Sequence, residues 1–339
     1  MTAYVRALRA VRRHLPLENV AQDPRPLVHY ATLAASSHNT QPWRFRCDRG
    51  RILIRPDLAR RCPVVDPDDH HLYVSLGCAV ENLLHAARAA GFEGHVSFQP
   101  ECGATTVELE PRTVLRTPLF EAIPRRQCTR SAYDGKALTA GELALLSRSG
   151  GADGVSVQLS TARHTRDQVA DYVAEGNRRQ FSSPAWKSEL RTWLRYSAAE
   201  AVACGDGLYG PVMGSPSAPR WLGSLATRLA LSAAAQNRRD SEGIRRSGAI
   251  AVIVSEQDDP AHWLAAGRCY QRLALQATVL GIAHAFINQP VEIASLRERF
   301  ADALGIDGGR PDLVLRLGRG PTMPATLRRP VEAVIDARG

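Results

Sequence analysis

The chain has 339 residues, of which 44% are hydrophobic and 23% charged, and its formal net charge is +9. This length suffices for one large or two ordinary domains with buried cores, which excludes a mainly disordered protein. No apolar run is long enough to span a membrane, and arginines interrupt the N-terminal segment too often for a secretory signal. We therefore expect a cytoplasmic globular protein.

The positive charge comes almost entirely from arginine. Lys136 and Lys187 are the only lysines, so 43 − 2 = 41 of the basic residues are arginines, and these are scattered along the chain. Proteins that bind nucleic acid gather basic residues on one face and usually carry a recognition motif, and neither feature is found in this sequence. The composition argues against nucleic acid as a partner and is compatible with small anionic molecules.

Cysteine and histidine do not form a metal-binding pattern. Seven cysteines lie singly, without CxxC spacing, which indicates reduced thiols rather than a disulfide framework or a zinc site. His70 and His71 are adjacent, and neighbouring side chains on a helix or a strand are expected to diverge. We therefore predict no metal site at this pair.

The first predicted element is a helix over 27–35 that runs into Ser36, followed by a polar loop from which Pro42 forces an extended exit. Residues 34–45 read AASSHNTQPWRF. Side chains of this loop that can hydrogen-bond to a planar ligand rich in nitrogen and oxygen are Ser36, Ser37, Asn39 and Gln41. An ordinary capping turn explains Ser and Asn equally well when the loop is considered alone.

An internal repeat relates the two halves of the chain. A shift of 190 residues aligns 68–100 with 258–290 without a gap, and eight of the 33 positions are identical, where chance gives about two or three. In both segments apolar residues recur at helical spacing before a glycine. Each segment therefore predicts a long core helix that ends near a glycine and leads into a short extended segment.

Strands are predicted around both helices. The first half contains RILIRP, HVSFQP and TTVELEP, and the second contains GVSVQLS, GAIAVIVS and DLVLRLG. We predict an α+β protein with two pseudo-repeated lobes, each with one buried helix per sheet, so that one chain imitates a homodimer. Residues 111–126 lack strong periodicity and are expected to form the crossover between a first lobe at 1–115 and a second at 116–339.

Two interpretations of residues 204–223 carry equal weight. The segment is rich in Gly, Pro and Ser, as expected of a surface loop, but it also contains Tyr209, Met213 and Trp221. A long loop with apolar side chains is also typical of a lid over a binding site.

Arginines cluster at two further places. In RRQCTR, Arg125, Arg126 and Arg130 could converge on a phosphate, because guanidinium groups donate paired hydrogen bonds while keeping their charge. Arg328 and Arg329 form a second basic pair near the C-terminus. Among 41 arginines, neither cluster assigns a function by itself.

Taken together, the motifs resemble a known family. AASSHNTQPWRF is similar to the PSSxNxQPW loop of the flavin-dependent nitroreductase family, and RRQCTRSAY looks like its RRSxRxF phosphate motif. LGRGPTMPATLRRPVEAVI resembles the C-terminal run of the same family. The order of the motifs looks most like the actinobacterial Acg branch, whose chains fuse two nitroreductase-like halves. The resemblance covers nearly the whole chain apart from the extreme N-terminus and residues 204–247.

The resemblance implies one FMN site per chain, because the serine loop is found only in the first half and the arginine motif only in the second. It implies that the arginines of the two clusters hold the phosphate and that the loop residues reach the ring across the internal interface, with Ser36 shaping the turn. The family serine is Cys128 here, a poorer donor that Thr129 could replace, and the family proline is Ala35. The implied cofactor-binding residues are Ser36, Ser37, Asn39, Gln41, Arg125, Arg126, Arg130, Arg328 and Arg329.

The implied function is an FMN-dependent oxidoreductase that transfers hydride or electrons, in ping-pong fashion, between NAD(P)H or an organic substrate and a second acceptor. NAD(P)H would be a transient co-substrate, and the partner a small molecule. The flavin N5 carries the chemistry, so no catalytic side-chain set is required. The alternative is an FMN-sequestering protein with little or no turnover. The resemblance is compatible with a monomeric pseudo-dimer or a homodimer.

Overall fold

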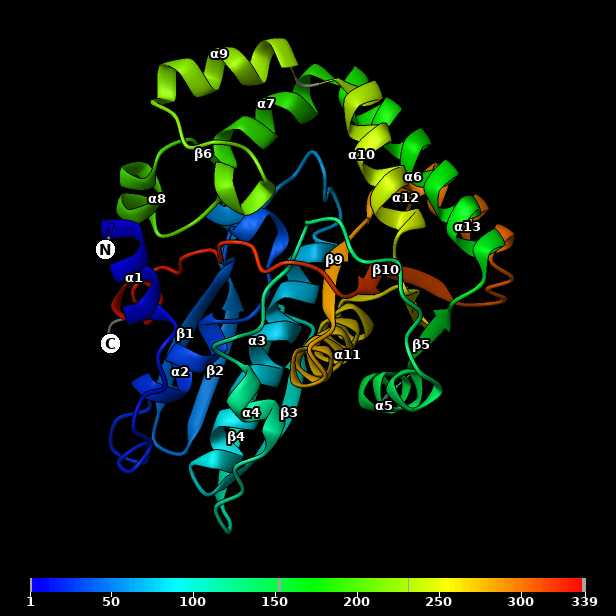
Figure 1. The fold of residues 1–339 in the computed structure, drawn as a ribbon. Coiled ribbons are helices and arrows are strands. Elements are labelled where there is room, and N and C mark those ends of the chain that lie inside the picture. The colour runs from blue at the N-terminus through cyan, green and yellow to red at the C-terminus, as the bar shows by residue number, and fades with distance from the viewer. Residues whose placement is uncertain (1, 152–153, 231, 337–339) are drawn as a thin grey trace.

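The computed structural model describes residues 2–151, 154–230 and 232–336 and shows two α+β lobes around two central helices (Figure 1). Each lobe contains a four-stranded antiparallel sheet. The first sheet has the spatial order β1 (Trp43–Asp48), β2 (Arg51–Pro56), β4 (Ala104–Pro111) and β3 (Phe92–Gln99). The second has the order β5 (Val155–Ser160), β8 (Ala249–Ser255), β10 (Arg310–Gly318) and β9 (Ala283–Phe286).

The two lobes have the same topology. In each, two strands are followed by one long helix and then by two more strands, and the last strand in the chain pairs between the second and third. The long helices are α3 (His70–Ala89) and α11 (Pro260–Val279), which are offset by the 190 residues of the sequence repeat. The predicted α+β fold is therefore confirmed, and the matching strand orders agree with two pseudo-repeated lobes.

The ends of both helices follow from their sequence. The Asp259 carboxylate caps α11 by accepting a hydrogen bond from the backbone N–H of His262 at 3.0 Å. Each helix ends just before a glycine with a left-handed φ, +87° at Gly91 and +68° at Gly281, where other residues would be strained. The chain can then turn directly into the following strand.

Helices α3 and α11 cross at two glycines. A Cβ atom on Gly77 would lie 2.0 Å from the backbone oxygen of Leu264, and one on Gly267 would lie 2.0 Å from that of Val74. The same shift of 190 residues relates Gly77 to Gly267 and Val74 to Leu264, so the contact is reciprocal, as in a two-fold symmetric dimer. The crossing is close because neither position has a side chain.

The lobes differ in one connection. A tight turn at 49–50 joins β1 to β2, whereas residues 161–248 join β5 to β8 and carry a group of helices that arches over one side of the molecule (Figure 1). This insertion contains α6 (Arg163–Ser182), α7 (Pro184–Trp193), β6 (Leu194–Arg195), α8 (Ala198–Cys204), β7 (Leu208–Tyr209), η3 (Gly210–Met213), α9 (Arg220–Ala230) and α10 (Ala233–Arg245).

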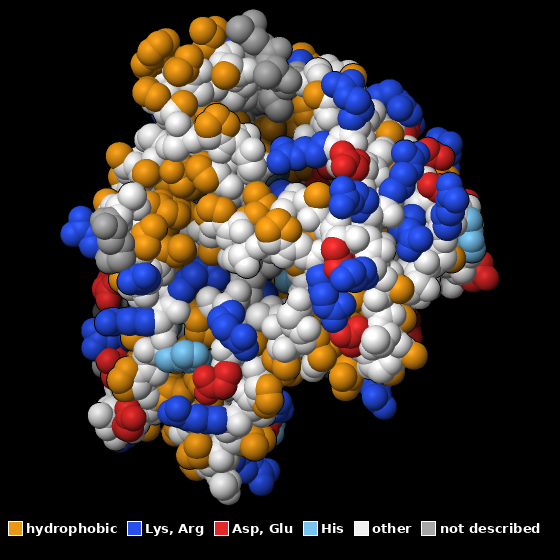
Figure 2. Space-filling view, viewed as in Figure 1, with side chains coloured by type: hydrophobic (Ala, Val, Ile, Leu, Met, Phe, Trp, Pro, Cys, Tyr) orange, Lys and Arg blue, Asp and Glu red, His pale blue; other side chains and the backbone are white. Residues whose placement is uncertain are grey.

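The remaining elements surround the two sheets. They are α1 (Ala3–Val11), α2 (Arg25–Thr32), η1 (Ser37–Asn39), η2 (Leu58–Arg60), α4 (Pro118–Ala122), α5 (Ala140–Gly150), α12 (Gln289–Glu292), α13 (Ala294–Ala303) and η4 (Val331–Ala333). No helix within the described ranges is both long and apolar enough to cross a membrane. On the face shown in Figure 2, Lys and Arg side chains are spread over both lobes, and exposed hydrophobic side chains gather over α8 and α9.

The C-terminal segment returns to the first lobe. Residues 319–336 run from β10 back to the edge of the first sheet, where Phe45 and Ile335 form a parallel bridge (Figure 1). The backbone N–H of Phe45 donates to the carbonyl of Val334 at 2.8 Å, and the Asp336 carboxylate pairs with Arg44. This segment therefore links the two lobes, and the boundary at 115/116 stays a prediction.

The first predicted helix is shorter than expected. It ends at Thr32 rather than running to Ser36, because the guanidinium group of Arg328 binds the backbone carbonyls of Thr32, Leu33 and Ala34. The sequence predicted extended segments after Pro42 and after Gly281 without assigning them as strands, and the structure shows them as β1 and β9. Both are edge strands that complete their sheets through long-range pairing.

The helix crossing leads to a stability prediction. Gly77→Ala should destabilise the protein by about 2 kcal/mol or more, because the added methyl group forces the two backbones apart. Gly141→Ala, in α5, should stabilise it by about 0.5 kcal/mol, because a Cβ added there would meet nothing within 4 Å and alanine favours a helix. Urea denaturation measures both, and equal midpoints for Gly77→Ala and wild type would contradict the close crossing.

Candidate functional site

A cavity of about 490 Å³ lies between the lobes, within the range typical of small-molecule sites. Its walls come from the loop at 35–38, the start of α3, residues 130–132, the segment 285–289 and the insertion at 161–248. The first lobe has only a tight turn where the second has the insertion. The cavity therefore lies where the insertion of the second lobe covers the interface between the lobes.

The serine loop has a strained backbone. His38, Asn39 and Gln41 have φ values of +46°, +55° and +56°, a region that non-glycine residues rarely occupy. The Ser36 hydroxyl accepts a hydrogen bond from the backbone N–H of Gln41 at 3.0 Å and closes the turn. Such strain persists only where surrounding contacts impose it, and it is common at functional sites.

Arg328 imposes much of this geometry. Its side chain is buried, and its Nε donates to the Thr32 carbonyl at 2.8 Å while Nη1 donates to Asn39 Oδ1 at 3.0 Å. The amide of Asn39 in turn donates to the Gly207 carbonyl at 3.1 Å. One guanidinium group therefore joins the end of α2 to the loop, and the loop is tied to the insertion.

Gln41 extends this buried junction. Its Nε2 donates to the Gly205 carbonyl at 2.9 Å, and its Oε1 accepts from the backbone N–H of Arg329 at 2.8 Å. The guanidinium group of Arg329 lies 3.6 Å from Asp57. Asn39, Gln41 and both C-terminal arginines thus bind one another and distant backbone, and they are not among the described residues that line the cavity.

The arginines of RRQCTR separate in the structure. Arg130 lines the cavity, whereas Arg126 is buried and donates to the Leu33 carbonyl at 3.0 Å. Arg125 is exposed and outside the cavity wall. Of the nine predicted site residues, the cavity brings together Ser36, Ser37 and Arg130.

Arg316 was not predicted from the sequence, yet it lies on β10 and lines the cavity. Its guanidinium group stacks on the Tyr133 ring at 4.1 Å, and Nη2 donates to the Ser131 carbonyl at 3.0 Å. Nη1 is buried without a hydrogen-bond partner. The sequence did contain a signal for Arg316, which is the only charged residue after Asp312 in the apolar segment DLVLRLG. A cation buried in such a strand requires a partner, and that partner can be a ligand.

Unpaired polar atoms in the cavity wall fit an anionic ligand with further polar groups. Arg316 Nη1 and Gln289 Oε1 are buried and unpaired, and leaving such groups unsatisfied costs about 1–3 kcal/mol each. Arg130 and the exposed Arg239 add positive charge to the wall. Phosphate oxygens are suitable partners for these guanidinium groups.

The wall also contains apolar and aromatic side chains, which suit a planar ring system. Met213, from the proposed lid segment, lines the cavity, whereas Trp221 of that segment is 71% exposed. Closure by this segment stays a prediction. The main apolar lining residues are Phe181, Trp186, Leu190, Leu208, Met213 and Phe286.

Two histidines beside the site remain neutral. Burial, followed by the nearby charge of Arg130, lowers the pKa of His38 to about 4. Burial and the charge of Arg126 lower the pKa of His284 to about 3, and the His284 carbonyl accepts from the backbone N–H of Thr129 at 2.8 Å. The arginines thus oppose any further positive charge at this site.

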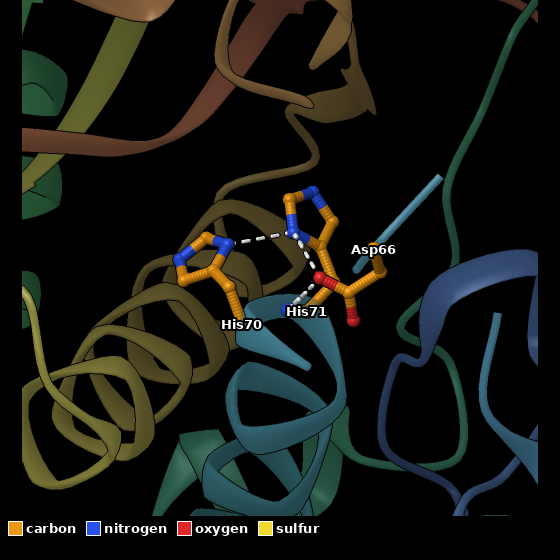
Figure 3. Close-up of side chains that lie close together, drawn as sticks. All are labelled: Asp66, His70 and His71. Carbon is orange, nitrogen blue, oxygen red and sulfur yellow. Dashed lines mark hydrogen bonds and ion pairs between the residues drawn. The ribbon is translucent and has the colours of Figure 1, made fainter. Parts of the chain in front are cut away.

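His70 and His71 do not diverge as predicted, and the expectation from their adjacency is wrong (Figure 3). Their Nδ1 atoms lie 2.7 Å apart, because the first turn of α3 places the two rings between Asp66 and Asp312. His71 also lines the cavity. Asp66, His70 and His71 are all buried, and their potential ligand atoms lie within 4.8 Å of one another.

The lowered pKa of His284 predicts a pH-dependent stability. The unfolded chain binds a proton near pH 6.5 that folded His284 does not bind until about pH 3, so the free energy of unfolding should fall as the pH is lowered through this window. The contribution is at most about 1.4 kcal/mol per pH unit. His284→Gln should reduce the slope measured by urea denaturation, whereas His95→Gln, on exposed β3, should not. Equal slopes for His284→Gln and wild type would contradict a neutral His284.

The sequence comparisons find relatives along almost the entire chain. The protein is 29% identical over 348 residues to "Putative NAD(P)H nitroreductase Rv3131" of Mycobacterium tuberculosis, covering 96% of this chain and 94% of that protein. It is 23% identical over 323 residues to "Putative NAD(P)H nitroreductase acg" of the same organism, covering 92% and 94%. No family model matches the sequence.

Solved structures with a similar arrangement include a nitroreductase with bound FMN from Desulfitobacterium hafniense, with a TM-score of 0.42, 13% identity and coverage of 66% of this chain and 100% of that one. Another is the FMN-dependent nitroreductase NfnB from Mycobacterium smegmatis in complex with NADPH, with a TM-score of 0.38, 13% identity and coverage of 60% and 87%. The chain thus resembles proteins named putative NAD(P)H nitroreductase, among them acg, along almost its full length.

Proposed function

We propose that this protein is an FMN-dependent oxidoreductase of the nitroreductase superfamily that holds one flavin in the cavity between its lobes. The proposal rests on one observation, that both lobes contribute residues to the cavity wall. The serine loop comes from the first lobe, and Arg130 and Arg316 come from the second. The names of the full-length relatives support the same activity.

The chain offers two kinds of contact to FMN. Arg130 and Arg316 would bind the phosphate, since Arg316 Nη1 is buried and unpaired. Ser36 and Ser37 would hydrogen-bond to the ring from the opposite lobe. Five of the other six predicted residues would act through the shape of the loop and the end of α2, namely Asn39, Gln41, Arg126, Arg328 and Arg329. The sixth, Arg125, is exposed outside the cavity wall.

Bound FMN supplies hydride transfer at its N5 atom, so the protein needs no catalytic triad or metal for the redox step. The contribution of the chain is to orient the ring, to keep water from it and to limit what reaches its exposed face. Phe181 and Trp186 of the insertion line this region. If both substrates use this cavity, exchange is ping-pong: NAD(P)H or an organic substrate leaves before the second acceptor enters.

The same geometry predicts one flavin per chain, because only the second lobe carries the cavity-forming insertion. We propose that lobes 1–115 and 116–339 act as a pseudo-dimer, either alone or within a homodimer, and that the protein is cytoplasmic. FMN sequestration remains the second candidate, because Leu208, Met213 and Gly214 of the insertion cover part of the cavity.

The visible spectrum of the purified protein tests cofactor binding, and a flavin-to-chain ratio of about one is expected. Under anaerobic conditions, NADPH should bleach the flavin and a nitroaromatic compound should restore its colour. Binding without reduction by NADPH or NADH would support sequestration. A protein that stays colourless in excess FMN would exclude both functions.

Substitution of the arginines tests the proposed phosphate contacts. Arg316→Gln and Arg130→Gln should each weaken FMN binding about 10–100-fold, because a charge-assisted hydrogen bond is worth about 1.5–3 kcal/mol. Arg148→Gln, on the exposed surface of α5, should leave the FMN dissociation constant unchanged. Fluorescence titration with FMN measures all three. Wild-type affinity in Arg316→Gln would show that the phosphate lies elsewhere.

A further inference from the structure

A chain of buried polar side chains leads from β10 to the cavity. The carboxylate of Asp312 lies 2.9 Å from Nε2 of His70. Nδ1 of His70 lies 2.7 Å from Nδ1 of His71 (Figure 3). Nε2 of His71 lies 3.3 Å from the amide nitrogen of Asn288, and both of these residues line the cavity. The cofactor proposal does not use this connection.

A β-bulge directs Asp312 to His70. The pairing of β10 with β8 shifts register between Pro311 and Leu313, so Asp312 falls at the irregular position. Its carboxylate is fully buried and also accepts a hydrogen bond from Arg310 Nη1 at 2.6 Å. Burial raises the pKa of Asp312 to about 6 and the charge of Arg310 opposes this rise, so the carboxylate is mainly negative at neutral pH next to the first imidazole.

The hydrogen-bond partners determine the tautomers of both histidines. Asn288 Oδ1 accepts from the backbone N–H of Val314 at 2.9 Å, so the Asn288 amide nitrogen must face His71 and donate to its Nε2. His71 then carries its proton on Nδ1 and donates it to Nδ1 of His70. His70 in turn carries its proton on Nε2 and donates to Asp312.

The distances favour this chain over a metal site. Two nitrogen ligands at about 2.0–2.1 Å from a tetrahedral metal lie roughly 3.3 Å apart, whereas the two Nδ1 atoms are separated by a hydrogen-bond distance of 2.7 Å. The oxygens of Asp66 are also in use, because they accept from the backbone N–H groups of His71 at 2.9 Å and Leu72 at 3.0 Å. Asp66 thus accepts hydrogen bonds from backbone N–H groups that have no partner within the first turn of α3.

We propose that His71 is a general base for an O–H or N–H group of a ligand in the cavity, with His70 and Asp312 as positioning residues. The ligand X–H group replaces the Asn288 amide as the hydrogen-bond partner of Nε2. The X–H bond then breaks and an Nε2–H bond forms, while the ligand keeps the electron pair. The Nδ1 proton of His71 can move to His70, which remains hydrogen-bonded to Asp312. The positive charge is thereby shared between the two rings beside a fixed carboxylate.

This inference deepens the proposed function, since it assumes that the cavity is the reaction site. It identifies the oxidised substrate as a compound that loses a proton from oxygen or nitrogen as well as a hydride. The hydride acceptor is the oxidised flavin of the proposed function. A nicotinamide donor would not need this base, because it gives up a hydride without losing a proton from oxygen or nitrogen.

Several charged groups surround the proton relay formed by His71, His70 and Asp312. Asp66 Oδ1 lies 3.8 Å from His71 Nδ1, and Glu292 Oε1 lies 3.8 Å from His71 Nε2. Arg310 pairs with Asp312 and lies 3.6 Å from Asp68, and its Nε lies 2.7 Å from Asp258. Burial lowers the pKa of His71 and raises that of Glu292. At His71, the charge of Glu292 raises the pKa and that of Arg310 lowers it. The relay therefore begins neutral, as a base must.

Nitrogen-15 NMR of the purified full-length protein tests the tautomers directly, without turnover or added ligand. The expected spectrum shows protonated Nδ1 and unprotonated Nε2 for His71 and the opposite for His70, with signals assigned through His71→Asn and His70→Asn. The Nδ1 tautomer is the less common one in water, so solvent exposure alone would not produce it. A His71 signal with protonated Nε2, or stoichiometric zinc bound to these residues, would overturn the proposal.

A second measurement tests the base with 4-nitrophenol, whose ionised form absorbs visible light. The acid dissociation constant of 4-nitrophenol bound to wild-type protein should be about tenfold larger than that of 4-nitrophenol bound to His71→Asn. In Asp312→Asn, the constant should lie between these two values. His95→Asn, on the exposed surface, is the matched control and should behave as wild type. Equal ionisation in wild type and His71→Asn would exclude His71 as the base.

These outcomes are separable from those of the cofactor proposal. The tautomers and the phenol titration can be measured whether or not the protein is reduced by NADPH. A correct tautomer chain in a protein that does not bind FMN would reject the oxidoreductase and retain the relay. An FMN enzyme with the opposite tautomers would retain the oxidoreductase and reject the relay.

Discussion

The structure depends on the close crossing of α3 and α11. Gly77 and Gly267 lack the side chains that would separate the helices, and each meets the partner backbone at the position that the internal repeat predicts. Since α3 packs on the first sheet and α11 on the second, this contact sets the distance between the lobes. The groups that meet at the cavity come from both sides of this interface.

Pseudo-symmetry alone would produce two equivalent clefts, and the insertion at 161–248 breaks that equivalence. In the first lobe a tight turn occupies the corresponding connection, so the first lobe supplies no equivalent group of helices. The insertion also holds the strained serine loop, because the carbonyls of Gly205 and Gly207 accept from Gln41 and Asn39. The same segment therefore encloses the cavity and fixes the conformation of its opposite wall.

Charge is distributed unevenly around the cavity. Arg130 and Arg316 add positive charge to the wall, and burial with neighbouring arginines keeps His38 and His284 neutral. A second group, around His71, is backed by the buried carboxylate of Asp312. An anionic ligand would compensate the first group, and a ligand that loses a proton would use the second. The two proposals thus concern different residues of one wall.

The sequence alone determined the features that depend on local pattern. Apolar periodicity and glycines located both core helices, the repeat identified two similar α+β lobes, and Pro42 marked the start of an extended segment. The serine loop was also recognisable, since its unusual density of polar residues lies within twelve positions. These features arise from contacts between residues close in the chain, or from a repeat that is visible in the letters.

Only the tertiary structure decided which polar groups face the cavity. Arg328 and Arg126 lie in recognisable clusters, yet they bind the carbonyls at the end of α2, while Arg316 lies in an apolar strand and reaches the cavity. His70 and His71 converge because Asp312, which is distant in sequence, is directed to them by a bulge. A side chain's partners depend on long-range packing, which residue type and spacing do not specify.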